Sequence, residues 1–110
     1  PGGLPLVIGE NVTVGHQCLL HACRIGDRCL IGMGSIVMDG AVIAADVLLA
    51  AGSLVSPGKL LEAGNLYRGN PAQKVRALTD QELEMLSYSA VHYVRLKNHY
   101  LDGIGISKPG

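Results

Sequence analysis

The amino-acid sequence predicts a mainly β protein in which very short strands stack into a solenoid, and three features of a repeat predict this class. Aliphatic residues return at every sixth position, first from Ile8 to Leu20 and then, one residue out of step, from Ile25 to the aromatic Tyr67. Most are followed by Gly or another small residue, and from Val12 to Ser53 the position four residues after each is small or β-branched, except at Arg24. Because repeats this short cannot each bury an apolar face alone, they must stack on one another.

This hexapeptide pattern resembles that of the left-handed parallel β-helix. In that fold, three repeats form one triangular coil of about eighteen residues, and the strands of successive coils lie roughly 4.8 Å apart. Residues 8–67 then form a little over three coils, with the repeated aliphatic side chains pointing inward. One residue is missing from the repeat between Leu20 and Ile25, which predicts a shortened turn beside His21.

The segments outside the repeat are predicted from turn and helix signals. Residues 1–7 are rich in Gly and Pro and form a loop, and Gly69-Asn70-Pro71 ends the regular repeat. Thr79 is expected to cap a helix, because Glu82 three residues later completes a capping box. We expect that helix to pack on the β-helix or on a neighbouring subunit. The predicted parts are a β-helix with flanking loops over residues 1–78, a C-terminal helix over 79–102 and a tail over 103–110.

Composition argues against several classes of partner. The chain has nine basic and nine acidic residues, no basic run and neither Phe nor Trp, so nucleic acid is not an expected partner. No apolar run approaches the roughly 18 residues of a membrane span, which predicts a soluble protein without a membrane partner. The three cysteines are closely spaced and odd in number, which fits reduced thiols and a cytoplasmic location.

His16 and His21 are the candidate metal ligands. A lone His is more often a structural residue, but two occur here five positions apart, and His21 stands where the repeat usually has Gly or Ala. Neutral imidazole is a common Zn²⁺ ligand, and catalytic zinc often has three protein ligands and one open position. Five residues of strand span up to about 16 Å, and an odd separation places side chains on opposite faces. We therefore expect the metal to lie between subunits, with His16 from one copy and His21 from its neighbour.

The sequence Gly15-His16 followed by His21, inside hexapeptide repeats and ahead of Gly69-Asn70-Pro71-Ala72 and a C-terminal helix, resembles the gamma-class carbonic anhydrases and their bacterial homologues. The resemblance implies a homotrimer with interfacial metals, usually Zn²⁺ although Fe²⁺ or Co²⁺ can serve, each held by three histidines from two subunits. His16 and His21 match two of those three. The implied activity is reversible hydration of carbon dioxide to bicarbonate by a metal-bound hydroxide. We expect the third ligand, with further coils, upstream of Pro1.

Five other side chains are further candidates for the site. Met33 and Met38 repeat the spacing of the two histidines one coil later, so they are expected either to form an apolar wall beside the metal or merely to fill gaps. Tyr88 is a candidate catalytic residue, since some members of the family bring a tyrosine from the C-terminal region towards the metal. Cys18 and Cys23 alternate with the histidines and suggest a mixed His and Cys zinc site, although thiols in inward corner positions serve as compact hydrophobes.

Two other classes of function remain open on the sequence. Hexapeptide β-helices include CoA-dependent acyltransferases, in which a His acts as general base, and CoA-thioester hydrolysis is a related possibility. A pair of histidines favours a metal, because an acyltransferase base needs only one. The third class is a non-catalytic assembly subunit, which loss of a ligand would favour, but both visible ligands are present.

Overall fold

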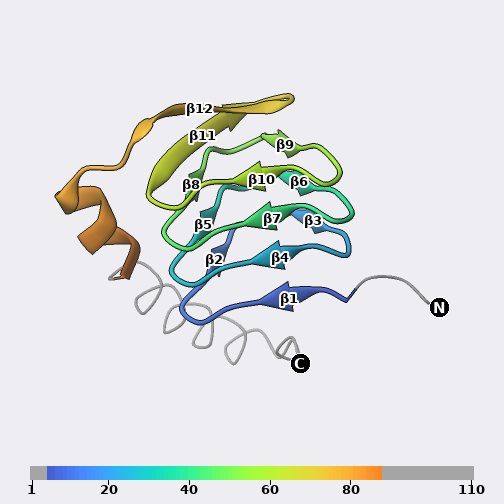
Figure 1. Ribbon diagram of the computed structural model, residues 1–110, viewed down its shortest axis with the longest axis horizontal. Coiled ribbons are helices and arrows are strands. Elements are labelled where there is room, and N and C mark those ends of the chain that lie inside the picture. The colour runs from blue at the N-terminus through green and yellow to red at the C-terminus, as the bar shows by residue number, and fades with distance from the viewer. Residues whose placement is uncertain (1–4, 88–110) are drawn as a thin grey trace.

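The computed structural model describes residues 5–87 and shows a parallel β-helix followed by a β-hairpin and a helix (Figure 1). The sequence predicts the β-helix and the helix but not the hairpin. Residues 1–4 and 88–110 lie outside the described part. The strands are β1 (Val7–Ile8), β2 (Thr13–Val14), β3 (Leu19–Leu20), β4 (Arg24–Ile25), β5 (Leu30–Ile31), β6 (Ile36–Val37), β7 (Val42–Ile43), β8 (Leu48–Leu49), β9 (Leu54–Val55), β10 (Leu60–Leu61), β11 (Asn65–Gly69) and β12 (Ala72–Ala77).

The strands form three sheets, one for each side of the triangular coil. Sheet A has the order β1-β4-β7-β10, sheet B the order β12-β11-β8-β5-β2, and sheet C the order β3-β6-β9. Val7 pairs with Arg24, seventeen residues later, whereas Arg24 pairs with Val42, eighteen residues later. The first coil is therefore one residue shorter than the second, as the shift in the repeat predicts.

The inward residues of the two-residue strands make the core. Six predicted inward residues have exposed fractions of at most 2 %, which confirms the pattern: Ile25, Ile31, Val37, Ile43, Leu49 and Val55. Leu61, above Ile43 in sheet A, and Tyr67, above Leu49 in sheet B, continue this pattern and are also buried. Ile8 occupies an inward position of the first described coil but is 43 % exposed, because within residues 5–87 no coil covers it from below.

The short corner after β3 lacks one particular residue. Most corners hold four residues, and the third has a positive φ, as at Gln17 and Arg28, or is a glycine such as Gly40. The corner His21–Cys23 holds only three residues and includes none of the positive-φ residues. Gly40 still donates its backbone N–H to the carbonyl of Ala22, at 2.7 Å. In other corners, too, the third residue donates to the carbonyl of the second residue of the corner in the coil below. The lost residue is therefore the left-handed third one.

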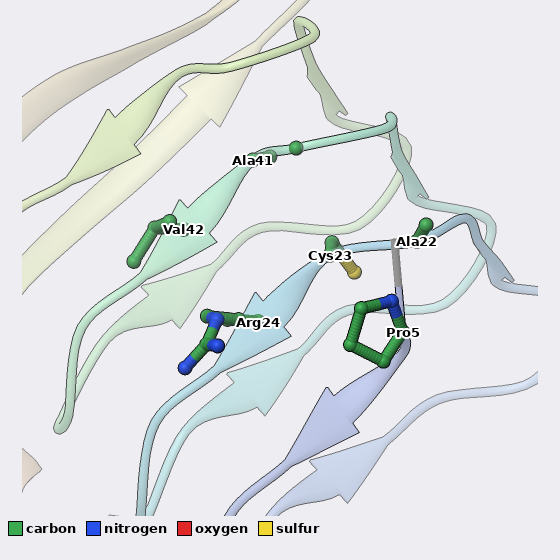
Figure 2. Close-up of a pocket in the computed structure, with 7 residues that line it drawn as sticks. Pro5, Ala22, Cys23, Arg24, Ala41 and Val42 are labelled. Carbon is green, nitrogen blue, oxygen red and sulfur yellow. The ribbon is translucent and has the colours of Figure 1, made fainter. Parts of the chain in front are cut away.

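The loss of this residue changes which side chain of the corner points into the core. Simple counting of the repeat assigns the place to Arg24, but the structure puts Cys23 there, 1 % exposed, and Arg24 on the outside. Figure 2 shows the hollow that remains beside the corner, with the Cys23 sulfur on the side of Pro5. The hollow is about 110 Å³ and is lined by Pro5, Ala22, Cys23, Arg24, Gly40, Ala41 and Val42.

A hairpin closes the end of the stack opposite β1 (Figure 1). Strand β11 continues sheet B in parallel with β8, then turns at Gly69–Ala72 and pairs antiparallel with β12. The sequence correctly predicts a break at Gly69-Asn70-Pro71, but it gives no sign of β12. Five of the six residues of β12 are exposed, so no buried period marks that strand.

The helix begins at the predicted cap and is described over residues 80–87. Thr79 N–H donates to the Glu82 carboxylate at 2.9 Å, and Glu82 N–H donates to the Thr79 hydroxyl at 3.1 Å, which confirms the capping box. Leu86 is buried, at 2 % exposure, as expected for its inner face. The rest of the predicted helix and the tail lie outside the described residues. Over the described part, no helix is both long enough and apolar enough to cross a membrane.

Candidate metal centre

His16 and His21 lie at opposite ends of β3, in two different corners of the triangle. His16 is exposed in the corner that leads from sheet B to sheet C, and His21 is partly exposed directly after β3, where the chain turns towards sheet A. The two imidazoles therefore flank the outward face of sheet C. The structure does not bring them together at one corner of this chain, and the expectation that the metal lies between subunits stays a prediction.

The outward face of sheet C is wholly aliphatic. Its outward residues are the first residues of β3, β6 and β9, which are Leu19, Ile36 and Leu54. Leu19 is 53 % exposed, although it is a large apolar side chain on a regular strand. An apolar stripe bounded by two imidazoles is thus what this side of the chain presents.

Met33 and Met38 lie directly above the two histidines, as their spacing predicts. Leu20 pairs with Val37, so the residues that follow them, His21 and Met38, are neighbours in adjacent coils. On the other side, Gly34 N–H donates to the carbonyl of His16 at 2.9 Å and fixes the corner that carries Met33 above it. Met33 is 59 % exposed and so extends the apolar stripe at that corner. The role of Met33 and Met38 as an apolar wall beside the metal stays a prediction.

Gly15 shows why the residue before His16 is glycine. A Cβ built on Gly15 would lie 2.6 Å from the backbone nitrogen of Met33, which is closer than real Cβ contacts come. The same close approach occurs at Gly26, which follows β4 in sheet A, and at Gly32, which follows β5 in sheet B. The corner that holds His16 is consequently packed tightly against the coil above it.

The place of His21 is less unusual than the sequence pattern indicates. Small residues follow most strands of sheets A and B, although Glu62 follows β10. In sheet C, the residue that follows β6 is the bulky Met38, and the one that follows β9 is the small Ser56. The corner after sheet C therefore accepts a bulky side chain in more than one coil. The shift in the repeat beside His21 is real, but a large residue at that position is a property of this corner and is not peculiar to the imidazole.

The imidazole of His21 contacts a carboxylate that sequence reasoning missed. His21 Nδ1 lies 3.4 Å from Asp39 Oδ1, with side chains 41 % and 70 % exposed. The sequence alone indicates a turn residue at Asp39, because the linear pattern does not show which residue of the next coil a corner side chain contacts. The register between adjacent coils is needed to identify Asp39 as the neighbour of His21. With Nδ1 facing Asp39, Nε2 is the nitrogen left to bind another group.

The cysteines behave as core residues. Cys18 Sγ donates to the carbonyl of Gly32 at 3.1 Å, and Cys29 Sγ donates to the carbonyl of Ala44 at 3.0 Å. Burial raises the pKa of the Cys29 thiol to about 11, and burial together with the charge of Asp39 also raises the pKa of Cys23. Since thiolates bind zinc, the raised pKa of Cys23 favours a structural role for that residue over the mixed His and Cys site.

Tyr88, the other expected contributor, lies outside the described residues and is not tested by them. Within residues 5–87, no three His, Cys, Asp or Glu side chains gather closely enough to hold a metal ion. His16 and His21, on their separate corners, remain the candidate donors.

Comparison with known proteins identifies the family. The model for "Bacterial transferase hexapeptide (six repeats)" matches residues 22–57. Protein YrdA of Escherichia coli is 55 % identical over 102 residues, which is 93 % of this chain and 55 % of YrdA. A probable carbonic anhydrase of Methanocaldococcus jannaschii is 50 % identical over 94 residues, 86 % of this chain and 59 % of that protein.

The chain carries hexapeptide repeats and is similar, over most of its own length, to YrdA and to the gamma carbonic anhydrases. Among solved structures, a hexapeptide transferase family protein from Anaplasma phagocytophilum superimposes with a TM-score of 0.78 at 43 % identity, covering 87 % of this chain and 62 % of that one. The chain spans about half the length of YrdA. The names of these relatives include a probable carbonic anhydrase and a hexapeptide transferase family protein, so the reaction of this chain is a matter for proposal.

Proposed function

We propose that this hexapeptide-repeat chain belongs to a carbonic anhydrase, which reversibly hydrates carbon dioxide to bicarbonate at a metal held between subunits. The observation that carries the proposal is the placement of His16 and His21 on either side of the aliphatic face of sheet C. Relatives named as carbonic anhydrases, up to 58 % identical over most of this chain, support it.

The donor atoms suit a divalent transition metal, with Zn²⁺ first and Fe²⁺ or Co²⁺ as alternatives. Neutral imidazole is a usual ligand of all three ions. Asp39 faces Nδ1 of His21, and metal-binding histidines commonly direct their second nitrogen at a carboxylate in this way. When bound, such a metal supplies Lewis-acid chemistry and lowers the pKa of a water molecule.

The partner in this proposal is a second and third copy of the chain. An exposed aliphatic stripe loses unfavourable contact with water when it packs on another stripe, and Leu19 alone is 53 % exposed. If three copies pack by sheet C around a threefold axis, the His16 corner of each copy meets the His21 corner of the next. In such a homotrimer, every site receives one histidine of each kind from two neighbouring copies.

Apolar side chains of this chain would favour binding of carbon dioxide by excluding bulk water from the site. Carbon dioxide is small and apolar, and Met33 and Met38 would line the approach on the side of the next coil. Their flexible thioether side chains fit irregular gaps.

A cytoplasmic location suits the three free cysteines, Cys18, Cys23 and Cys29.

Metal analysis combined with a carbon dioxide hydration assay tests this function. His16→Ala and His21→Ala should each lower metal content and hydration strongly, because every interfacial site loses one donor. His92→Ala is the matched control, a histidine that is not proposed as a ligand, and it should retain both. Full metal content and hydration in both site variants would contradict the proposal.

An acyltransferase is the second candidate, because the matching repeat model and the Anaplasma structure carry transferase descriptions. In that case one histidine would act as a general base on an acceptor hydroxyl or amine. Acetyl-CoA turnover that survives chelation of metals and depends on one of the two histidines alone would favour this reaction. Hydration that stops on chelation and returns with Zn²⁺ or Co²⁺ favours the anhydrase.

A further inference from the structure

We propose that Asp39 is a positioning residue that holds His21 in the Nδ1–H tautomer, so that Nε2 is free to bind the metal. The inference rests on the proposed function for its purpose. Its geometrical basis is independent of that function, because it concerns only the contact between two adjacent coils of this chain. No metal ligand beyond His16 and His21 is assumed.

The coil geometry places the side chains of His21 and Asp39 next to each other. Across the solenoid, the first residue of a corner faces the second residue of the corner above. A Cβ on Gly15 would strike the backbone of Met33, and a Cβ on Gly26 would strike that of Ala45, both by this relation. Glycine avoids the clash at those corners. At the corner after sheet C, the first residue is His21 and the second residue above is Asp39, and there the two side chains meet at 3.4 Å.

Hydrogen bonds hold the backbone of Asp39 from both sides. Its carbonyl accepts the N–H of Gly58 from the coil above at 3.0 Å, and the next residue, Gly40, donates to Ala22 in the coil below at 2.7 Å. His21 is held in the same way, since its N–H donates to the carbonyl of Val37 at 2.9 Å. The backbone atoms on both sides of the contact are therefore parts of the solenoid ladder, and only short side chains separate them.

The charge of Asp39 selects the tautomer. A carboxylate accepts hydrogen bonds only, so an Nδ1 that faces it is favoured when it carries a proton and disfavoured when it presents its lone pair. In a neutral imidazole the proton on Nδ1 leaves Nε2 unprotonated, which is the form that binds a metal ion. Packing of another copy against sheet C would reduce solvent screening of this contact, which is now partly exposed.

Nitrogen NMR of the metal-free chain tests the proposal without any use of enzymatic activity. Long-range ¹H–¹⁵N correlation of the imidazole at about pH 8.5, where a free imidazole is neutral, should show His21 mainly as the Nδ1–H tautomer. Asp39→Ala should shift His21 towards the Nε2–H form that unrestrained histidine prefers. Asp39→Asn should give a mixture, because its amide can either accept from or donate to Nδ1.

The matched control is Asp27→Ala, which removes a carboxylate from the same second corner position of the same coil. Asp27 accepts the N–H of Glu10 and does not contact His21, so the His21 tautomer should not change. In protein that binds Co²⁺ or Zn²⁺, Asp39→Ala should also weaken metal affinity by about 10- to 100-fold, and Asp27→Ala should not.

Two results would overturn the proposal. One is a His21 that is mainly Nε2–H in the unaltered chain, and the other is an Nδ1–H preference that survives Asp39→Ala. Either result refutes the positioning role even if the protein hydrates carbon dioxide. Conversely, a chain with the expected tautomers and no metal binding keeps the positioning role and refutes the proposed function, so the two failures can be told apart.

Discussion

Substitution of Gly15 by Ala tests the link between coil packing and the candidate site. The added Cβ would lie 2.6 Å from the Met33 nitrogen and 2.8 Å from its Cα, where ordinary contact begins at 3.4 Å. Both atoms belong to the backbone, so the two coils must separate locally by about 0.8 Å at this corner. Two hydrogen bonds cross the same place, from Gly15 to Ile31 at 2.8 Å and from Gly34 to His16 at 2.9 Å.

The expected destabilisation follows from those contacts. Overpacking typically costs about 1–3 kcal/mol, and weakening of either hydrogen bond adds about 0.5–1.5 kcal/mol. We therefore expect Gly15→Ala to lower the free energy of unfolding by about 2–4 kcal/mol. The assay is equilibrium denaturation in urea, with all variants at one protein concentration because any oligomer makes stability depend on concentration.

The control for this substitution is Gly34→Ala. A Cβ there meets nothing within 4 Å, and only the positive φ of 70° opposes it, at a cost of about 1–2 kcal/mol. Gly15→Ala should also reduce metal affinity, since it displaces the corner that carries His16, whereas Gly34→Ala should have a smaller effect. Gly15→Ala with an unchanged unfolding free energy would refute the packing argument.

Three further outcomes are expected. The Arg76 guanidinium and the capping N–H hold the pKa of Glu82 down to about 2, so the contribution of this exposed carboxylate to stability is present above about pH 4.5 and is lost as pH falls towards 2. Urea denaturation from pH 6 to pH 2 should show this loss in the unaltered chain and not in Glu82→Gln. A thiol reagent at neutral pH should modify Cys29 only on unfolding, because it is buried and its pKa is about 11; rapid labelling of the native protein would contradict that assignment. Leu19→Glu should shift the oligomer towards monomer in sedimentation and lower metal content, whereas Leu60→Glu, at an equally exposed position on sheet A, should not; unchanged sedimentation of Leu19→Glu would exclude sheet C as the interface.

The sequence predicts the core of this protein well because one local rule governs it. A strand of two residues sends the second residue inward, so the six-residue period alone identifies Ile31, Val37 and Leu49 as buried. The capping box at Thr79 is equally local, as it involves residues only three apart. Local patterns of this kind can be read without knowledge of the fold.

The features that the sequence does not predict depend on contacts between distant residues. Strand β12 exists because it pairs with β11, and its exposed residues carry no buried period. Assignment of the inward corner place to Arg24 fails because the lost residue is the left-handed one, which moves Cys23 into the core. The contact between His21 and Asp39 requires the register of two coils.

The central claim is that His16 and His21 serve one metal from different copies of the chain, and subunit complementation tests it most directly. His16→Ala and His21→Ala are purified separately, then unfolded and refolded together, and metal is measured in the mixed oligomer. In a mixed trimer, one interface joins an intact His16 to an intact His21 of the neighbouring copy. The proposal therefore predicts that an equal mixture regains about a quarter of the metal and hydration activity of the unaltered protein, while each variant alone regains neither. A mixture that binds no more metal than the separate variants would show that both histidines must come from the same chain, and would contradict the account.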